Sequence, residues 1–110
     1  KKKIQIKSIA HITGGGLVEN LPRAIPEFLK AEINSESWEK PEVFDWIKKE
    51  GNISENQMMR IFNNGIGITL IVSPSDVDTA QKCLTDLGEK AFQIGKITNR
   101  KSNCASILIE

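Results

Sequence analysis

The chain passes from a strand-like pattern to a helix-like pattern within residues 9–23, IAHITGGGLVENLPR. Three consecutive glycines, Gly14, Gly15 and Gly16, separate the two patterns, so backbone amides without neighbouring Cβ atoms lie where a strand turns into a helix. The first amides of a helix carry partial positive charge and have no partner within the helix. The glycines therefore form either an anion-binding loop or a tight turn without a ligand, and a glycine cluster alone does not decide between the two.

Polar side chains flank the glycines on both sides. Residues 3–13 alternate, and the two faces of the expected strand are Ile4, Ile6, Ser8, Ala10 and Ile12 on one side, with Gln5, Lys7, Ile9, His11 and Thr13 on the other. His11 and Thr13 thus lie at the C-terminal end of the strand, where open α/β sheets tend to bind ligands. Asn20 and Glu19 follow one turn beyond the glycines and could reach the same ligand. A hydrogen-bonded structural role is the alternative for His11, and Glu19 could instead complement the helix N-terminus.

Turn and capping residues predict the next elements. A short helix follows the glycines and ends before Pro22, because proline disfavours helical geometry in the residue before it. Residues 28–33 alternate as a second strand. Pro41 and Gly51 bound a helix over residues 42–49. We expect the apolar stripe of this helix to pack in the core: Val43, Phe44, Trp46 and Ile47.

A capping box of Ser54 and Gln57 predicts the start of a further helix. The turn at residues 63–65 then leads into a strand over residues 66–72. Its nearly continuous apolar run is typical of a strand buried on both faces. Gly67 within this strand predicts the close approach of a neighbouring element or of a ligand.

The C-terminal third is predicted to contain one helix followed by two strands. Ser75 and Asp78 are spaced as a second capping box, and Gly88 ends the helix that they would open. Residues 91–97 and 105–109 then read as two closing strands, antiparallel to one another across the loop that joins them. The predicted class is α+β, an α/β sandwich with a mixed, largely antiparallel sheet and helices packed on one face.

Composition narrows the possible partners. The 110 residues make about one small domain, and 15 basic against 14 acidic residues, scattered along the chain, argue against a nucleic-acid partner. No apolar run approaches the roughly 20 residues of a membrane span, so we expect no membrane partner and a cytoplasmic protein. Cys83 and Cys104 lack the spacing of metal ligands and are expected to be core thiols. No metal site and no catalytic side chain is assigned from the residues.

Residues 10–23 closely resemble the signature of the C-terminal domain in the phosphoribosylformylglycinamidine cyclo-ligase family, also called aminoimidazole ribonucleotide (AIR) synthetases. Later landmarks of that domain follow in the same order: Trp38, residues 41–46, residues 59–67 and Gly95. The resemblance covers essentially the whole chain. It implies that residues 1–110 are a single partial domain of AIR synthetase C-terminal-domain type. The N-terminal ATP-binding domain and the first part of this domain would then be absent, and a start without methionine agrees with a fragment.

This resemblance implies an enzyme of purine biosynthesis that converts formylglycinamidine ribonucleotide to aminoimidazole ribonucleotide with ATP and Mg²⁺. In the family, ATP activates the formyl amide oxygen by phosphorylation, the amidine nitrogen attacks the carbon, and phosphate leaves. It further implies that Gly14, Gly15 and Gly16 contact a phosphate, with His11, Thr13 and Asn20 as nearby polar contacts. ATP and Mg²⁺ would be bound mainly by the missing N-terminal domain. The full-length enzyme would be a homodimer, and this fragment alone would be inactive.

The chain departs from the family pattern at two positions. Ile61 stands where the family commonly has Thr, and Asn64 where a smaller or apolar residue is frequent, which puts any contact made by that Thr in doubt. Two alternatives remain. One is another ATP-dependent member of the same superfamily, a formylglycinamidine ribonucleotide synthase or a selenophosphate synthetase-like protein. The other is a non-catalytic α+β ligand-binding module, which would explain the shortage of catalytic side chains.

Overall fold

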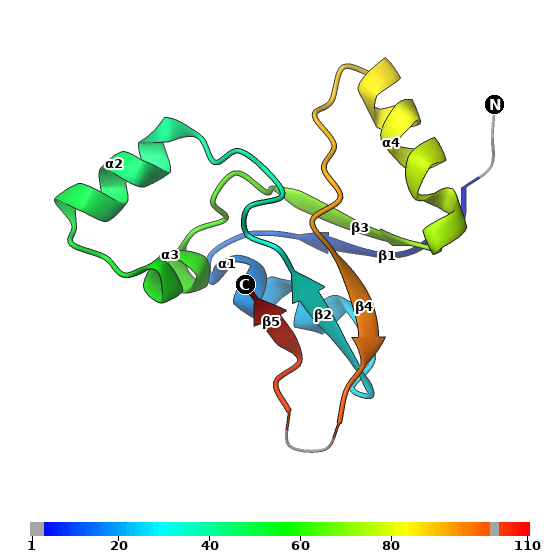
Figure 1. Cartoon of the computed structure of the whole chain (residues 1–110), viewed down its shortest axis with the longest axis horizontal. Helices are drawn as coiled ribbons and strands as arrows, with labels where there is room; N and C mark the ends of the chain where they lie inside the picture. Colours follow the sequence, from blue (N-terminus) through cyan, green and yellow to red (C-terminus); the bar gives the residue numbers. More distant parts are fainter. Residues whose placement is uncertain (1–3, 102–103) are drawn as a thin grey trace.

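The structure, a computed structural model, describes residues 4–101 and 104–110 (Figure 1). The helices and strands of these residues follow in the order β1 (Ile6–His11), α1 (Gly16–Asn20), η1 (Pro22–Ala24), β2 (Leu29–Ile33), α2 (Glu42–Glu50), α3 (Glu55–Ile61), β3 (Ile68–Val72), η2 (Pro74–Asp76), α4 (Val77–Asp86), β4 (Gly95–Asn99) and β5 (Ile107–Ile109), where η marks a 3₁₀ turn. The predicted α+β class is confirmed.

The strands form two small sheets in the described part of the chain. β1 and β3 pair as an antiparallel ribbon in which His11 lies opposite Ile68 and Ile6 opposite Val72. β2 is the central strand of the second sheet, antiparallel to β4 and parallel to β5. The arrangement is mixed and largely antiparallel, as predicted, but it is divided between two sheets. β4 and β5 run in opposite directions, as expected, yet β2 lies between them. The predicted loop between these strands includes residues 102–103, which lie outside the described residues.

The core lies between the two sheets, and α1 with its C-cap contributes two of its most deeply buried side chains. Leu17 of α1 and Leu21, the C-cap residue four positions later and therefore on the same face, are each 1% exposed. The helix ends at Asn20, before Pro22, as predicted, and Pro22 then opens a 3₁₀ turn. The other apolar residues of this core cluster come from most of the chain: Ala10, Ile12, Ala31, Ile33, Trp38, Met59, Ile66 and Ile94.

The prediction that residues 66–72 are buried on both faces is wrong. β3 belongs to a two-stranded ribbon of which only one face is covered, so Ile68 remains 63% exposed. No described atom other than those of its chain neighbours lies within 4 Å of a Cβ built on Gly67, so no neighbouring element packs closely against it, and the close approach of a ligand stays a prediction. On β1 the alternation holds for Ala10 and Ile12 but not for Ile6, which is 46% exposed because the register shifts just after it.

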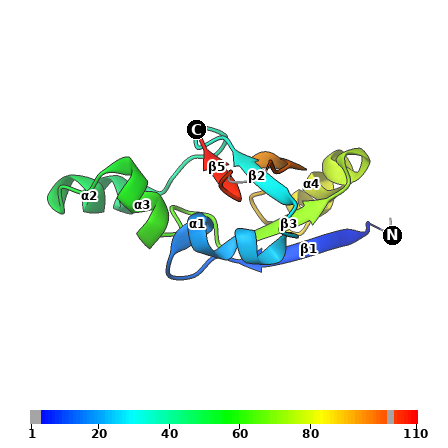
Figure 2. The same cartoon turned by 90° about the horizontal axis from the view of Figure 1, so that it is seen from below.

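α2 forms between Pro41 and Gly51 as predicted, but its apolar stripe is not a core surface. Figures 1 and 2 both place α2 at the outer end of the molecule, beyond α3. Val43 and Trp46 are 53% and 64% exposed, whereas Phe44 packs against Phe62 with ring centroids 6.2 Å apart. α2 meets α3 through this aromatic pair and through Lys48 and Glu55, and these contacts leave most of the stripe uncovered.

Of the two predicted capping boxes, only the first forms. The Ser54 hydroxyl accepts from the Gln57 amide and the Gln57 side chain accepts from the Ser54 amide, both at 3.2 Å. The box at Ser75 and Asp78 is wrong, because Pro74 opens a 3₁₀ turn that shifts the N-cap to Asp76, whose side chain accepts no capping bond.

The cysteines and the helix lengths test two further expectations. Cys104 is exposed just before β5, so its prediction as a core thiol is wrong, and Cys83 is half-buried on α4. No helix in the described ranges is long and apolar enough to cross a membrane.

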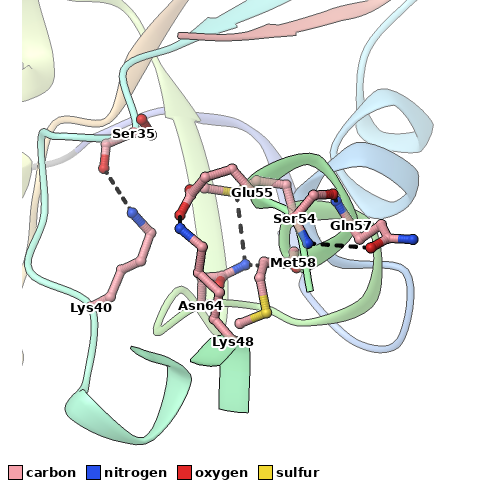
Figure 3. Close-up of polar contacts among 9 residues, drawn as sticks. Ser35, Lys40, Lys48, Ser54, Glu55, Gln57, Met58 and Asn64 are labelled. Atoms are coloured by element: carbon pink, nitrogen blue, oxygen red, sulfur yellow. Dashed lines mark hydrogen bonds and ion pairs between the residues drawn. The ribbon is translucent and has the colours of Figure 1, made fainter. Parts of the chain in front are cut away.

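An ion pair between Lys48 of α2 and Glu55 of α3 joins these two helices (Figure 3). The hydrogen bond from Lys48 holds the pKa of Glu55 below its usual range. A lowered folded-state pKa stabilises the protein above the unfolded-state pKa, and this contribution is lost as the pH falls through the folded-state value. We expect Lys48→Met to raise the pKa of Glu55 in a carboxyl NMR titration, and Lys49→Met to leave it unchanged. An equal pKa in both variants would contradict the pairing.

Candidate functional site

The glycine segment connects the end of β1 to α1 through an unusual backbone. Gly15 and Gly16 have φ angles of 94° and 61°, in the left-handed region that favours glycine. The amide of Gly16 donates to the Thr13 carbonyl oxygen at 3.0 Å, which closes a tight turn. In the described residues, no hydrogen bond has the amide of Gly14 or of Gly15 as its donor. Two amides at the end of a strand are therefore available to an external acceptor.

Gly16 is required for packing as well as for backbone conformation. It is buried, and a Cβ built on it would collide with the carbonyl oxygens of Met59 and Phe62, which belong to the C-terminal end of α3. α1 thus rests directly on the end of α3 without an intervening side chain. Because the amide of Gly16 already has an internal acceptor, Gly16 shapes the loop while Gly14 and Gly15 present their amides.

Asn20, the last residue of α1, points back into the loop. Its side-chain amide lies 2.8 Å from the Gly16 carbonyl oxygen and 3.3 Å from those of Thr13 and Gly14. Its oxygen accepts from the Thr13 hydroxyl at 3.2 Å. With only 9% of its surface exposed, Asn20 is a buried polar residue whose partners are all in the loop.

The other polar neighbours of the loop face solvent. His11 and Thr13 are exposed at the end of β1, on the face that the alternation predicts. The Glu19 carboxylate leans back over Gly15 and lies where a Cβ of Gly15 would be. A negative charge at this position opposes an anion on the same side of Gly15. The amides of Gly14 and Gly15 would therefore have to be approached from the side away from Glu19.

Asn64 organises the end of α3 on which Gly16 rests. It is 1% exposed, and its side-chain amide donates at 3.0 Å to the Met58 carbonyl oxygen (Figure 3). The same amide donates at 3.0 Å to the Phe62 carbonyl oxygen. The backbone carbonyl oxygen of Asn64 accepts a hydrogen bond from the Trp38 ring nitrogen at 3.0 Å. The Phe62 oxygen is thus both a partner of Asn64 and a contact of Gly16. The sequence predicted Asn64 as part of a turn and as a departure from the family pattern, but not its role at the end of α3; its φ of 54° agrees with the Asn-Gly turn signal.

The described residues also form open clefts away from the loop, and no predicted site residue lines the two best defined of them. A cleft of about 680 Å³ separates α3 from β5, with Val18, Met59 and Arg60 in its walls. The other, of about 660 Å³, runs beside β4 and includes Glu32. The Thr98 hydroxyl donates to Glu32 at 2.7 Å and, with Lys30 and Lys96, lowers the pKa of this carboxyl. Neither of these two clefts includes the glycine loop.

The chemistry that these residues offer is binding through backbone amides. The described ranges contain no group of three or more His, Cys, Asp or Glu side chains that could hold a metal ion. The loop supplies two hydrogen-bond donors at the start of a helix, a combination suited to a phosphate oxygen.

Comparison with known proteins gives this loop a family context. A family model described as "AIR synthase related protein, C-terminal domain" matches residues 1–105. The chain is 41% identical over 109 residues to the phosphoribosylformylglycinamidine cyclo-ligase of Nitrosospira multiformis, which covers 99% of this chain and 31% of the relative. It is 45% identical over 108 residues to the enzyme of the same name from Staphylococcus aureus, with 98% and 32% covered.

Both matches cover nearly all of the chain but only a part of each relative. The chain spans about a third of the length of the curated relatives that it matches. These matches confirm the resemblance seen in the glycine segment and in the later landmarks, and the aligned region includes almost every residue of the chain. The chain belongs to the family of AIR synthase related proteins and corresponds to their C-terminal domain.

Proposed function

We propose that this chain is the C-terminal domain of an ATP-dependent cyclo-ligase that converts formylglycinamidine ribonucleotide to aminoimidazole ribonucleotide. Family membership and the names of the matched relatives support the proposal. Because those relatives are about three times as long, the activity would need the remainder of such a protein. ATP would supply the phosphoryl group that turns the formyl amide oxygen into a leaving group.

The part assigned to this domain is to bind a phosphate at the glycine loop. The observation that carries this assignment is the pair of amides, Gly14 and Gly15, that have no acceptor within the described residues. Either the phosphate of the substrate ribose or the phosphoryl group in transfer would offer the oxygens that they need. The exposed side chains of His11 and Thr13 lie beside the loop and would contact the same ligand.

The remaining parts of the proposal concern what accompanies this domain. A preceding domain would bind ATP and Mg²⁺ and cover the open surface around the loop, and the whole enzyme would be a homodimer. We place it in the cytoplasm, where ATP is available to a biosynthetic ligase. Residues 1–110 would then be a partial domain.

Gly14 provides the test, because a Cβ built on it has no described atom within 4 Å other than those of its chain neighbours. In the full-length protein, Gly14→Val should fold normally but place two methyl groups where the ligand approaches. We expect kcat/KM for formylglycinamidine ribonucleotide to fall at least about 100-fold, the loss of two charge-assisted hydrogen bonds. The assay is ADP release that depends on this substrate. Ser75→Ala, an exposed change beyond the opposite end of the β1–β3 ribbon, is the control.

The possible results separate the alternatives. Activity of the wild-type protein that is lost in Gly14→Val and kept in Ser75→Ala supports both the reaction and the role of the loop. A wild-type protein that turns over a different amide or selenide substrate would instead identify another member of the superfamily. Binding without any turnover would favour a non-catalytic module. Full activity in Gly14→Val would remove the loop from the phosphate site.

A further inference from the structure

Asn20 gathers the carbonyl groups of the glycine loop at one buried point. Its side-chain amide has two hydrogens but three carbonyl oxygens within reach, at 2.8 Å for Gly16 and 3.3 Å for both Thr13 and Gly14. The hydrogen bonds to the two more distant oxygens are therefore shared. The hydroxyl of Thr13 donates to the remaining atom, the Asn20 oxygen. No donor or acceptor of this side chain is directed away from the loop.

The planarity of the peptide bond connects this inward arrangement to the outward face of the loop. In a trans peptide, the carbonyl of one residue and the amide of the next point in opposite directions. A Thr13 carbonyl turned toward Asn20 therefore turns the Gly14 amide away from it, and the Gly14 carbonyl does the same to the Gly15 amide. These are the two amides that lack an acceptor in the described residues. Asn20 therefore helps to orient both donors, together with the Gly16 amide, which also donates to the Thr13 carbonyl oxygen.

We propose that Asn20 is a positioning residue that aims the amides of Gly14 and Gly15 at a phosphate group without touching the ligand itself. This inference rests on the proposed function of the loop. It replaces the role that the resemblance implied for Asn20, a direct polar contact with the ligand. A glycine loop is otherwise free to rotate its peptides, because glycine has few steric limits. If the loop peptides are already fixed before binding, less conformational entropy is lost when the ligand binds.

Asn20→Asp in the full-length protein tests the inference, because it keeps the size and shape of the side chain. The carboxylate cannot donate, and its charge repels the three carbonyl oxygens that Asn20 attracts. We expect the loop peptides to turn and a phosphate-bearing ligand to bind at least about 10-fold more weakly, about one lost hydrogen bond to a charged group. Isothermal titration would measure the dissociation constants of formylglycinamidine ribonucleotide, of its phosphate-free ribonucleoside, and of ATP.

The ribonucleoside separates positioning from a loss of folding. If Asn20 orients the amides, Asn20→Asp weakens the ribonucleotide or ATP and leaves ribonucleoside binding unchanged, and the weakened ligand identifies which phosphate the loop holds. Equal weakening of all three ligands, or of none, would overturn the inference. Asn99→Asp on β4 makes the same chemical change at an exposed residue and is the matched control.

Two further results keep the inference distinct from the proposed function. If the wild-type protein neither binds the ribonucleotide nor consumes ATP with it, the proposed function fails whatever Asn20 does. If Asn20→Asp does not fold, Asn20→Ala replaces it, because it removes the donors without adding a charge. We expect from Asn20→Ala a smaller loss, about 3-fold or more, again only for ligands with a phosphate. Phosphate-independent loss in Asn20→Ala would contradict positioning.

Discussion

Gly16→Ala is expected to lower the free energy of unfolding by about 3 kcal/mol or more, through strain at a left-handed residue and overpacking of the interior. The new methyl group would meet the carbonyl oxygens of Met59 and Phe62. Both are backbone atoms at the end of α3, so neither can rotate aside as a side chain could. α1 would have to move away from α3 and expose Leu17, one of the most deeply buried side chains. Urea denaturation followed by circular dichroism measures the loss.

The neighbouring glycines form an internal control series for this prediction. Gly14→Ala adds the same methyl group in open space without a left-handed φ, and its unfolding free energy should stay within about 0.5 kcal/mol of the wild-type value. Gly15→Ala should be intermediate, about 1–2 kcal/mol, because φ is 94° but the colliding group is the flexible side chain of Glu19. If Gly16→Ala were no more harmful than Gly14→Ala, α1 would not rest on α3 as described.

Local signals in the sequence predicted the ends of elements well because their causes are local. Pro22 stops α1, Pro41 and Gly51 bound α2, and Ser54 with Gln57 caps α3. Each effect depends on backbone groups within a few residues. The second capping box failed for a reason that is also local, since the 3₁₀ turn opened by the preceding proline moved the N-cap.

Burial was predicted less well, because it depends on which surfaces the rest of the chain supplies. Apolar patterns at Trp46 and Ile68 correctly indicated a helix and a strand but not their exposure. An amphipathic pattern indicates that one face favours an apolar neighbour. It does not indicate whether the described residues supply that neighbour. The exposed stripe of α2 and the exposed face of the β1–β3 ribbon are both of this kind.

The same distinction between local and long-range causes applies to the candidate site. His11, Thr13 and the glycines were predicted together because they are contiguous, and the end of a strand places them at one edge. The sequence could not show which of these residues shapes the loop and which present hydrogen-bond donors to a ligand. Gly16 is fixed by contacts with α3, more than 40 residues away, and Asn20 acts on carbonyl groups that no pattern of side chains reveals.

Asn64→Ala is the second substitution expected to have a large effect, about 2–4 kcal/mol of unfolding free energy. It leaves the carbonyl oxygen of Phe62 without its side-chain donor, at about 1–3 kcal/mol for a buried group, and it puts alanine at a φ of 54°, whereas the Met58 oxygen keeps the Phe62 amide as a donor. Asn64→Gly separates the two causes, because glycine loses the same hydrogen bonds but tolerates this φ. Asn64→Gly should therefore be less destabilised than Asn64→Ala by about 1 kcal/mol.

Trp38 offers a direct probe of this region, because its ring nitrogen donates to the Asn64 carbonyl oxygen at 3.0 Å. In a Trp46→Phe background Trp38 is the one remaining tryptophan, and its buried fluorescence should shift to longer wavelength as the turn loosens. Because the Phe62 oxygen contacts both Asn64 and Gly16, the double variant with Gly16→Ala should lose less stability than the sum of the single losses. Strict additivity would mean that the glycine loop and the end of α3 are energetically independent, contrary to their shared carbonyl.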